Sequence, residues 1–115
     1  MDRIHIRDLR LRAVIGVYPE ERRDRQELVF NLELQTDLRQ AGKSDRLEDT
    51  VDYKALKQRV IALVEASEYF LLEKLAEEVA LACLATPGVT GVRVVVDKPG
   101  ALRFARSVAV DITRP

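Results

Sequence analysis

The sequence predicts an α+β fold in which a four-stranded antiparallel sheet carries two helices on one face. Apolar residues alternate in two segments before residue 36 and in two segments after residue 91, a pattern typical of half-buried strands. Between them, two segments repeat apolar residues at helical spacing. The order strand, strand, helix, helix, strand, strand allows both strand pairs to form antiparallel hairpins with their apolar faces under the helices.

The first strand is predicted within residues 4–13, with a bulge or bend near Arg7 and Asp8. Apolar residues alternate with charged ones at first, and the apolar phase then shifts by one. Because such a shift turns every later side chain to the other face, the strand needs an irregularity there. Gly16 ends the strand, and the charged segment that follows is expected to be an exposed loop. Residues 28–35 alternate most clearly and predict the second strand.

The middle of the chain is expected to hold a loop and then the two helices. Residues 37–50 are polar and lack apolar periodicity, which indicates a connecting loop. Thr50 or Asp52 can cap the first helix, and that helix is expected to end near residues 66–67. The second helix opens around Phe70 and stops before a Pro-Gly pair.

Length and composition exclude several classes of protein. A chain of 115 residues has the size of one domain, which we expect to span residues 1–115. The 19 basic and 19 acidic residues cancel, so no nucleic-acid partner is expected. No apolar run is long enough to cross a bilayer and the charged start MDRIHIRD does not fit a signal peptide, so we expect a cytoplasmic protein with no membrane partner.

A metal site is not expected, because His5 and Cys83 are the only histidine and cysteine and supply too few ligands for zinc. Cys83 falls on the apolar face of the second helix, which favours a buried thiol. His5 alternates outward on the first strand, which favours a surface position.

Four residues at element boundaries are candidates for chemistry, and each has a plain alternative. Lys98 lies where a strand ends, held by the following Pro-Gly pair, and it is either a positioned amine or a charge that guards a sheet edge. Glu73, in the first turn of the second helix, either favours the helix dipole or accepts two hydrogen bonds from a planar N–H/NH₂ edge. Tyr53 opens the first helix and Glu21 lies in the charged loop, and each is either part of a site or a surface residue.

Read together and in this order, the motifs IGVYPEE, TVDYKAL, FLLEKLAEEVA and DKPGALRFARSV resemble those of the dihydroneopterin aldolase family over essentially the whole chain. The resemblance implies the tunnelling fold, in which four subunits close their sheets into a barrel and two such rings stack into a homo-octamer. It implies a pterin substrate bound between subunits and no cofactor. Glu73 and the backbone of Leu72 would anchor the pterin, Lys98 would be the acid/base group, and Tyr53 and Glu21 would line the substrate's side chain and assist.

The reaction that the resemblance implies is the retro-aldol cleavage of 7,8-dihydroneopterin in folate biosynthesis, which gives 6-hydroxymethyl-7,8-dihydropterin and glycolaldehyde. The C6=N5 imine of the pterin takes the electrons of the broken bond, so neither a Schiff base nor a metal is required. The segment LRFARSV is more similar to the related dihydroneopterin triphosphate epimerases, and epimerase activity is the alternative. A pterin-binding, ring-forming protein without catalysis is the third reading.

Overall fold

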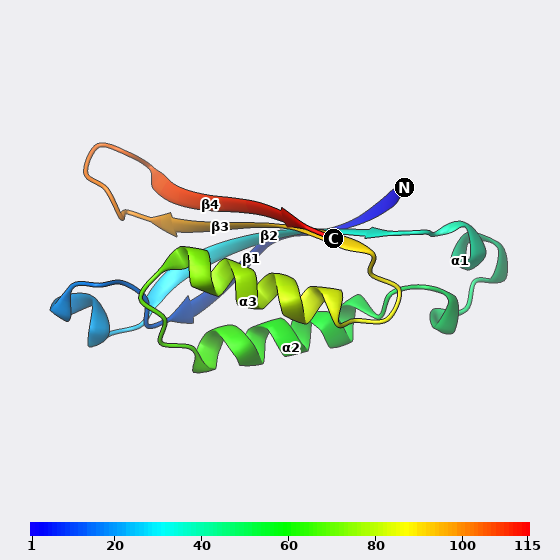
Figure 1. Ribbon diagram of the computed structural model, residues 1–115, viewed down its shortest axis with the longest axis horizontal. Helices are drawn as coiled ribbons and strands as arrows, with labels where there is room; N and C mark the ends of the chain where they lie inside the picture. Colours follow the sequence, from blue (N-terminus) through cyan, green and yellow to red (C-terminus); the bar gives the residue numbers. More distant parts are fainter.

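A computed structural model describes residues 1–115 and has a single antiparallel sheet lying over two long helices (Figure 1). The four strands are neighbours in the order in which they occur in the sequence, so every connection in the sheet joins adjacent strands. The strands are β1 (Asp2–Ala13), β2 (Gln26–Thr36), β3 (Gly91–Pro99) and β4 (Ser107–Arg114). The helices are the 3₁₀ helix η1 (Pro19–Arg22), α1 (Arg39–Ser44), the 3₁₀ helix η2 (Leu47–Asp49), α2 (Tyr53–Ala66) and α3 (Leu72–Leu84). The predicted fold class is confirmed.

The predicted irregularity in β1 is a β-bulge. The pairing of β1 with β2 shifts register between Ile6 and Leu9, and Asp8 has a left-handed backbone with φ of 55°. The side chain of Asn31 on β2 accepts the backbone N–H of Asp8 at 3.0 Å, so the amide that the bulge removes from the strand pairing keeps a partner. The bulge lets the apolar side chains on both sides of it face the helices.

The core lies between the sheet and the two long helices. The alternating apolar residues of β2 and β3 are all at most 1% exposed, and they meet the apolar stripes of α2 and α3 in one cluster of 20 buried residues. Full burial of such a side chain is worth about 1.5–3 kcal/mol. The buried cluster includes Leu28, Phe30, Leu32, Leu34, Leu56, Val60, Val64, Leu75, Val79, Val92, Val94 and Val96. This packing fixes which ends of the helices meet which ends of the strands.

Two expectations for the connections are wrong. The segment expected to be a loop after β2 contains α1 and η2, and neither helix buries a residue; a helix without a buried face leaves no apolar periodicity in the sequence. The helix expected to open around Phe70 begins at Leu72. Of the two caps considered for α2, Asp52 is the one used, because its carboxylate accepts the backbone N–H of Ala55 at 3.0 Å.

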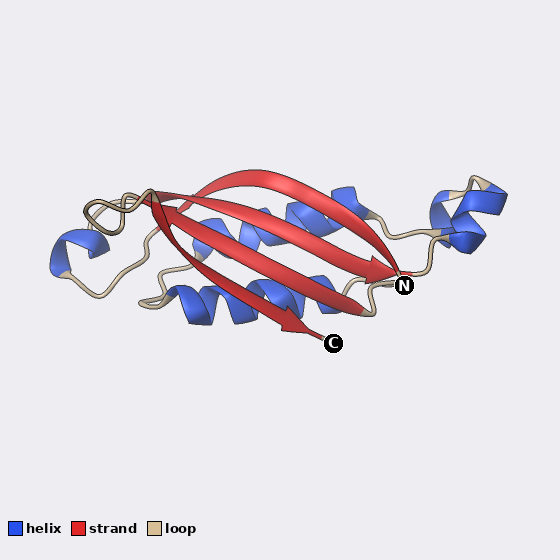
Figure 2. Cartoon of the chain, turned by 90° about the horizontal axis from the view of Figure 1, so that it is seen from above, coloured by secondary structure: helices blue, strands red, loops and turns tan.

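The second face of the sheet carries no helix, as the view from above shows (Figure 2). Its side chains are mainly polar and form ion pairs between neighbouring strands. Arg93 on β3 pairs with Asp111 on β4 at 2.6 Å, and Arg3 on β1 pairs with Glu33 on β2 at 3.1 Å. We call this surface the open face.

Candidate functional site

A cavity of about 310 Å³ lies at one end of the molecule, where the loop after β1, the start of α3 and the β3–β4 hairpin come together. We call it the end cavity. Figure 1 shows these three segments gathered at the same end, away from α1. Most of its 14 lining residues are apolar, and the charged ones come from three distant parts of the chain. The lining includes Ile15, Gly16, Tyr18, Glu21, Phe70, Leu71, Leu72, Glu73, Lys98, Leu102 and Val108.

An ion pair joins two of the predicted residues inside this cavity. The Nζ of Lys98 donates to Oε2 of Glu21 at 2.6 Å, and the two side chains are only 12% and 20% exposed. The hydrogen bond from Lys98 lowers the pKa of the Glu21 carboxyl below its usual value, while partial burial opposes this and the backbone N–H of Tyr18 adds to it. The structure therefore brings together an ionised carboxylate and an amine that are 77 residues apart in the sequence.

The position of Glu21 depends on a glycine. Gly16 has φ of +127°, a backbone conformation that other residues rarely adopt. A Cβ atom at this position would lie 2.3–2.5 Å from the carboxylate atoms of Glu21, which is closer than atoms in contact can approach. A residue larger than glycine would thus both strain the loop and push the carboxylate away from Lys98.

The start of α3 supplies the second carboxylate of the cavity. Glu73 lies in the first turn of the helix and faces the end cavity, and it takes part in none of the ion pairs of the molecule. Leu72 beside it is buried, with 8% exposure. Leu71 precedes the helix, and its side chain makes no capping hydrogen bond. The first backbone N–H groups of α3 therefore have no side-chain cap as a partner. This end of the cavity offers hydrogen-bond acceptors and donors side by side.

Tyr53 is the predicted site residue that the structure does not bring to the end cavity. It is the first residue of α2 and is 56% exposed. The 14 residues of α2 span about 21 Å at 1.5 Å per residue, and the helix must be traversed in full before the chain turns into α3. Figure 1 accordingly shows the start of α2 toward the α1 end of the molecule. Within one chain, Tyr53 cannot reach Lys98 or Glu73.

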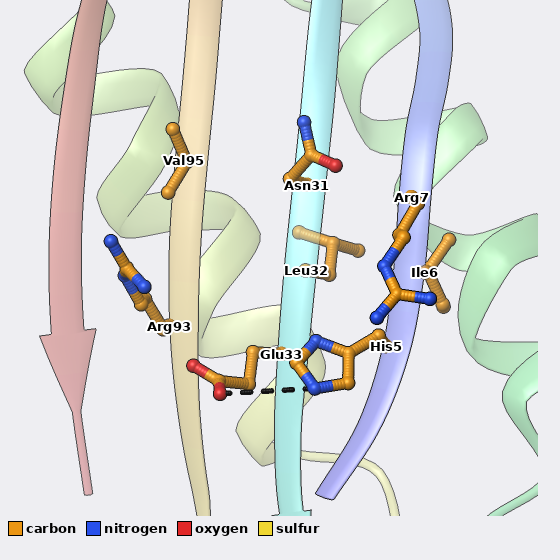
Figure 3. Close-up of a pocket in the computed structure, with 8 residues that line it drawn as sticks. All are labelled: His5, Ile6, Arg7, Asn31, Leu32, Glu33, Arg93 and Val95. Carbon is orange, nitrogen blue, oxygen red and sulfur yellow. Dashed lines mark ion pairs between the residues drawn. The ribbon is translucent and has the colours of Figure 1, made fainter.

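A second, smaller cavity of about 110 Å³ lies on the open face, lined by residues of β1, β2 and β3 (Figure 3). None of the predicted site residues lines it. His5, which was expected at the surface, is exposed there, and its Nε2 lies 3.9 Å from Oε1 of Glu33. Cys83, expected to be buried, is buried in the core, where loss of contact with water raises the pKa of its thiol to about 12.

Two further observations concern ligands and membranes. No group of three His, Cys, Asp or Glu side chains is placed to hold a metal ion.

None of the helices combines the length and the apolar character needed to cross a bilayer.

Sequence reasoning missed two residues around the cavity. Gly16 was considered only as the end of a strand, although its place in the motif IGVYPEE was a signal. Arg22 was one of several charges in an exposed loop, and no sequence signal distinguishes it from Arg23 beside it. In the structure, Arg22 reaches the backbone of the α2–α3 connection.

Comparison with known proteins assigns the chain to a family. The family model described as dihydroneopterin aldolase matches residues 4–113. The chain belongs to the dihydroneopterin aldolase family.

Particular relatives include both activities considered from the sequence. The chain is 40% identical to the dihydroneopterin aldolase of Escherichia coli K12 over 99% of its own length and 93% of that protein. It is 35% identical to the dihydroneopterin triphosphate 2'-epimerase of Pseudomonas aeruginosa, covering 97% of this chain and 91% of that one. It also matches the folic acid synthesis protein FOL1 of Dictyostelium discoideum at 40% identity, and spans only 17% of that protein.

A solved structure shows the same fold. The crystal structure of E. coli dihydroneopterin aldolase in complex with neopterin superposes with a TM-score of 0.92 at 38% identity and covers the full length of both chains.

Proposed function

We propose that this protein is a dihydroneopterin aldolase of folate biosynthesis and that the end cavity is its pterin site. One observation carries the proposal: folding brings Glu21, Glu73 and Lys98, from three separate segments, to one apolar-walled cavity. A flat heterocycle with a polar edge suits such walls, since apolar surfaces hold the ring and a few polar groups fix its orientation. The relatives named above support the choice of a pterin.

In the proposed complex, Glu73 accepts two hydrogen bonds from the amino-pyrimidine edge of the ring, and the backbone at Leu72 completes the contact. A carboxylate matches an N–H/NH₂ edge in both spacing and charge. The ring edge at Glu73 then directs the substrate's side chain toward Lys98 and Glu21, because those groups line the same cavity. Binding and chemistry would therefore lie at two ends of one cavity.

The proposed chemistry is a retro-aldol cleavage by acid/base catalysis. In the neutral amine form, Lys98 takes the proton of the 2′-hydroxyl through a water molecule that Glu21 helps to hold. The C2′–O bond then becomes a carbonyl, the C1′–C2′ bond breaks, and its electron pair moves into the C6=N5 imine to give an enamine. Glycolaldehyde leaves. Protonation of C1′ then gives 6-hydroxymethyl-7,8-dihydropterin, so no electrons are gained or lost overall. Proton transfer by a positioned side chain contributes about 10²–10⁴-fold to the rate.

Tyr53 enters this scheme only through a second copy of the chain. It lies a helix length from the end cavity, and in an oligomer it would serve the cavity of a neighbouring subunit, where it helps to manage the proton that reaches C1′. This fits the proposed assembly, in which sheets close edge to edge into rings of four and two rings stack into an octamer. The unpaired edges of β1 and β4 provide the surfaces for such closure.

The epimerase is the second candidate, and the segment LRFARSV together with the 35% identity to an epimerase favours it. Both reactions begin with the same bond cleavage, and the epimerase keeps the released aldehyde, which still carries the triphosphate, in place for re-addition to the other face. Purified protein is incubated in parallel with 7,8-dihydroneopterin and with its triphosphate, and products are separated by chromatography. The aldolase predicts 6-hydroxymethyl-7,8-dihydropterin from the first substrate as the faster reaction. Faster conversion of the triphosphate to its C2′ epimer would make the protein an epimerase, and turnover of neither substrate would contradict both.

A further inference from the structure

Arg22 connects two loops that flank the end cavity. Its Nη1 donates to the carbonyl oxygens of Gly16 and Tyr69, each at 3.0 Å, and its Nη2 donates to that of Glu68. The guanidinium also lies over the ring of Phe70, 4.2 Å from the ring centroid, which adds a cation–π contact. Both terminal nitrogens of the guanidinium donate hydrogen bonds, although the surrounding sequence is a run of surface charges.

One of the connected loops carries Glu21, and the other leads to Glu73. The first loop, residues 14–25, lies between β1 and β2 and contains η1; it holds Gly16 and Glu21. The second loop, residues 67–71, leads directly into the helix start that holds Glu73. The Lys98–Glu21 pair joins the middle of the first loop to β3, and the contacts of Arg22 join it to the second loop. The Arg22 contacts therefore control where Glu21 sits relative to Glu73.

We infer that Arg22 is a positioning residue for the proposed reaction: it holds the loop that carries Glu21 against the start of α3, and so keeps the Glu21 carboxylate on Lys98. This inference rests on the proposed function. The geometry requires an arginine, because one guanidinium donates to carbonyls in two loops at once, whereas a lysine ammonium is a single point donor on a flexible stem.

The test compares Arg22→Ala and Arg22→Lys with the control Arg23→Ala, which removes the same charge from the adjacent exposed position. Misplacement of a catalytic group by about 1 Å costs up to about 10²-fold, so kcat for cleavage of dihydroneopterin should fall by about tenfold or more in both Arg22 variants. The KM should change less than kcat, since Glu73 still binds the ring. Arg23→Ala should match the wild type.

A double-variant comparison separates positioning from general destabilisation. If Arg22 acts through Glu21, then Arg22→Ala should lower kcat by less than about twofold when it is introduced into a Glu21→Gln protein, because coupled residues are not additive. A full, additive loss of kcat in that background would overturn the inference. Melting temperatures of all variants, measured alongside, show that folded protein is being compared.

A measurement independent of turnover keeps this inference separate from the proposed function. The carboxyl carbon of Glu21 is titrated by NMR in ¹³C-labelled protein. Its pKa lies below the usual value in the wild type, and it should return toward 4.5 in Arg22→Ala and stay low in Arg23→Ala. An unchanged pKa in Arg22→Ala would overturn the positioning role. If the wild type cleaves no pterin, the proposed function fails, and this titration alone decides what Arg22 does.

Discussion

Two ion pairs of this protein have the same length and very different surroundings. Lys98 and Glu21 are 2.6 Å apart in the end cavity, and Arg93 and Asp111 are 2.6 Å apart on the open face. The first pair is 12% and 20% exposed, and the second is 50% and 46% exposed. Figure 3 shows Arg93 among the polar side chains of the sheet, with no segment covering them.

The difference teaches that burial, and not distance, separates the Lys98–Glu21 pair from an ordinary surface ion pair. Water screens the open-face pair, and such pairs contribute at most about 1 kcal/mol. In the cavity the same charges interact through a less polar medium and act more strongly on each other and on a bound ligand. Among all ion pairs of the chain, only Lys98–Glu21 has both side chains less than a quarter exposed.

The largest expected effect is that of Lys98→Ala. Removing the proposed acid/base group should lower kcat for dihydroneopterin cleavage by about 10³-fold, while neopterin binding changes by less than tenfold. Lys74→Ala is the matched control, because Lys74 loses the same charge from an exposed pair with Glu78. Steady-state rates and fluorescence titrations measure both quantities. Residual activity within tenfold of the wild type would show that the cavity pair is no more catalytic than the surface pair.

Glu73→Gln should give the next largest effect, on binding. The amide presents only one oxygen acceptor to the pterin edge and loses the charge, so the affinity for neopterin should fall by about 10–100-fold. Calorimetry or fluorescence quenching measures it. Glu78→Gln, on the same helix and outside the cavity, should bind as the wild type does. Equal affinities of the Glu73 and Glu78 variants would place the ring somewhere else.

The effect of Glu21→Gln on the free energy of unfolding should depend on pH. Folding lowers the pKa of Glu21, so its contribution to stability is fully present above the usual value of 4.5 and is lost as the pH falls through the lowered value. At pH 7 the variant should be less stable by about 1 kcal/mol, and the difference should vanish as the pH is lowered below 4.5. Urea unfolding at a series of pH values measures this. A difference that stays constant over that range would mean that the ionised carboxylate does not stabilise the fold.

The smallest effect is expected for Arg93→Ala on the open face. Its free energy of unfolding should change by no more than about 0.5 kcal/mol, and kcat should not change. The same unfolding and rate measurements apply. A loss larger than that of Glu21→Gln would break the comparison between the two pairs.

The fold was predictable because its signals are local. The alternation in β2, the phase shift that became the bulge at Asp8, and the helical stripes of α2 and α3 each follow from the spacing of apolar residues. The short helix α1 escaped prediction because it buries nothing. Local pattern thus predicts an element only where that element contributes to the core.

The site was predictable only in part. Resemblance to known motifs named Glu21, Glu73 and Lys98, but nothing local shows that Glu21 and Lys98 touch across 77 residues. The need for glycine at position 16 arises from its φ of +127° and from the Glu21 carboxylate, which occupies the space for a Cβ. Properties that depend on how distant segments meet become visible only in three dimensions.

A crystal structure of the protein soaked with neopterin tests the central claim most directly. The account predicts the pterin in the end cavity, with its amino-pyrimidine edge within hydrogen-bond distance of the Glu73 carboxylate and its side-chain hydroxyls near Lys98. Density for the pterin on the open face, or a ring whose polar edge lies away from Glu73 in every subunit, would contradict it.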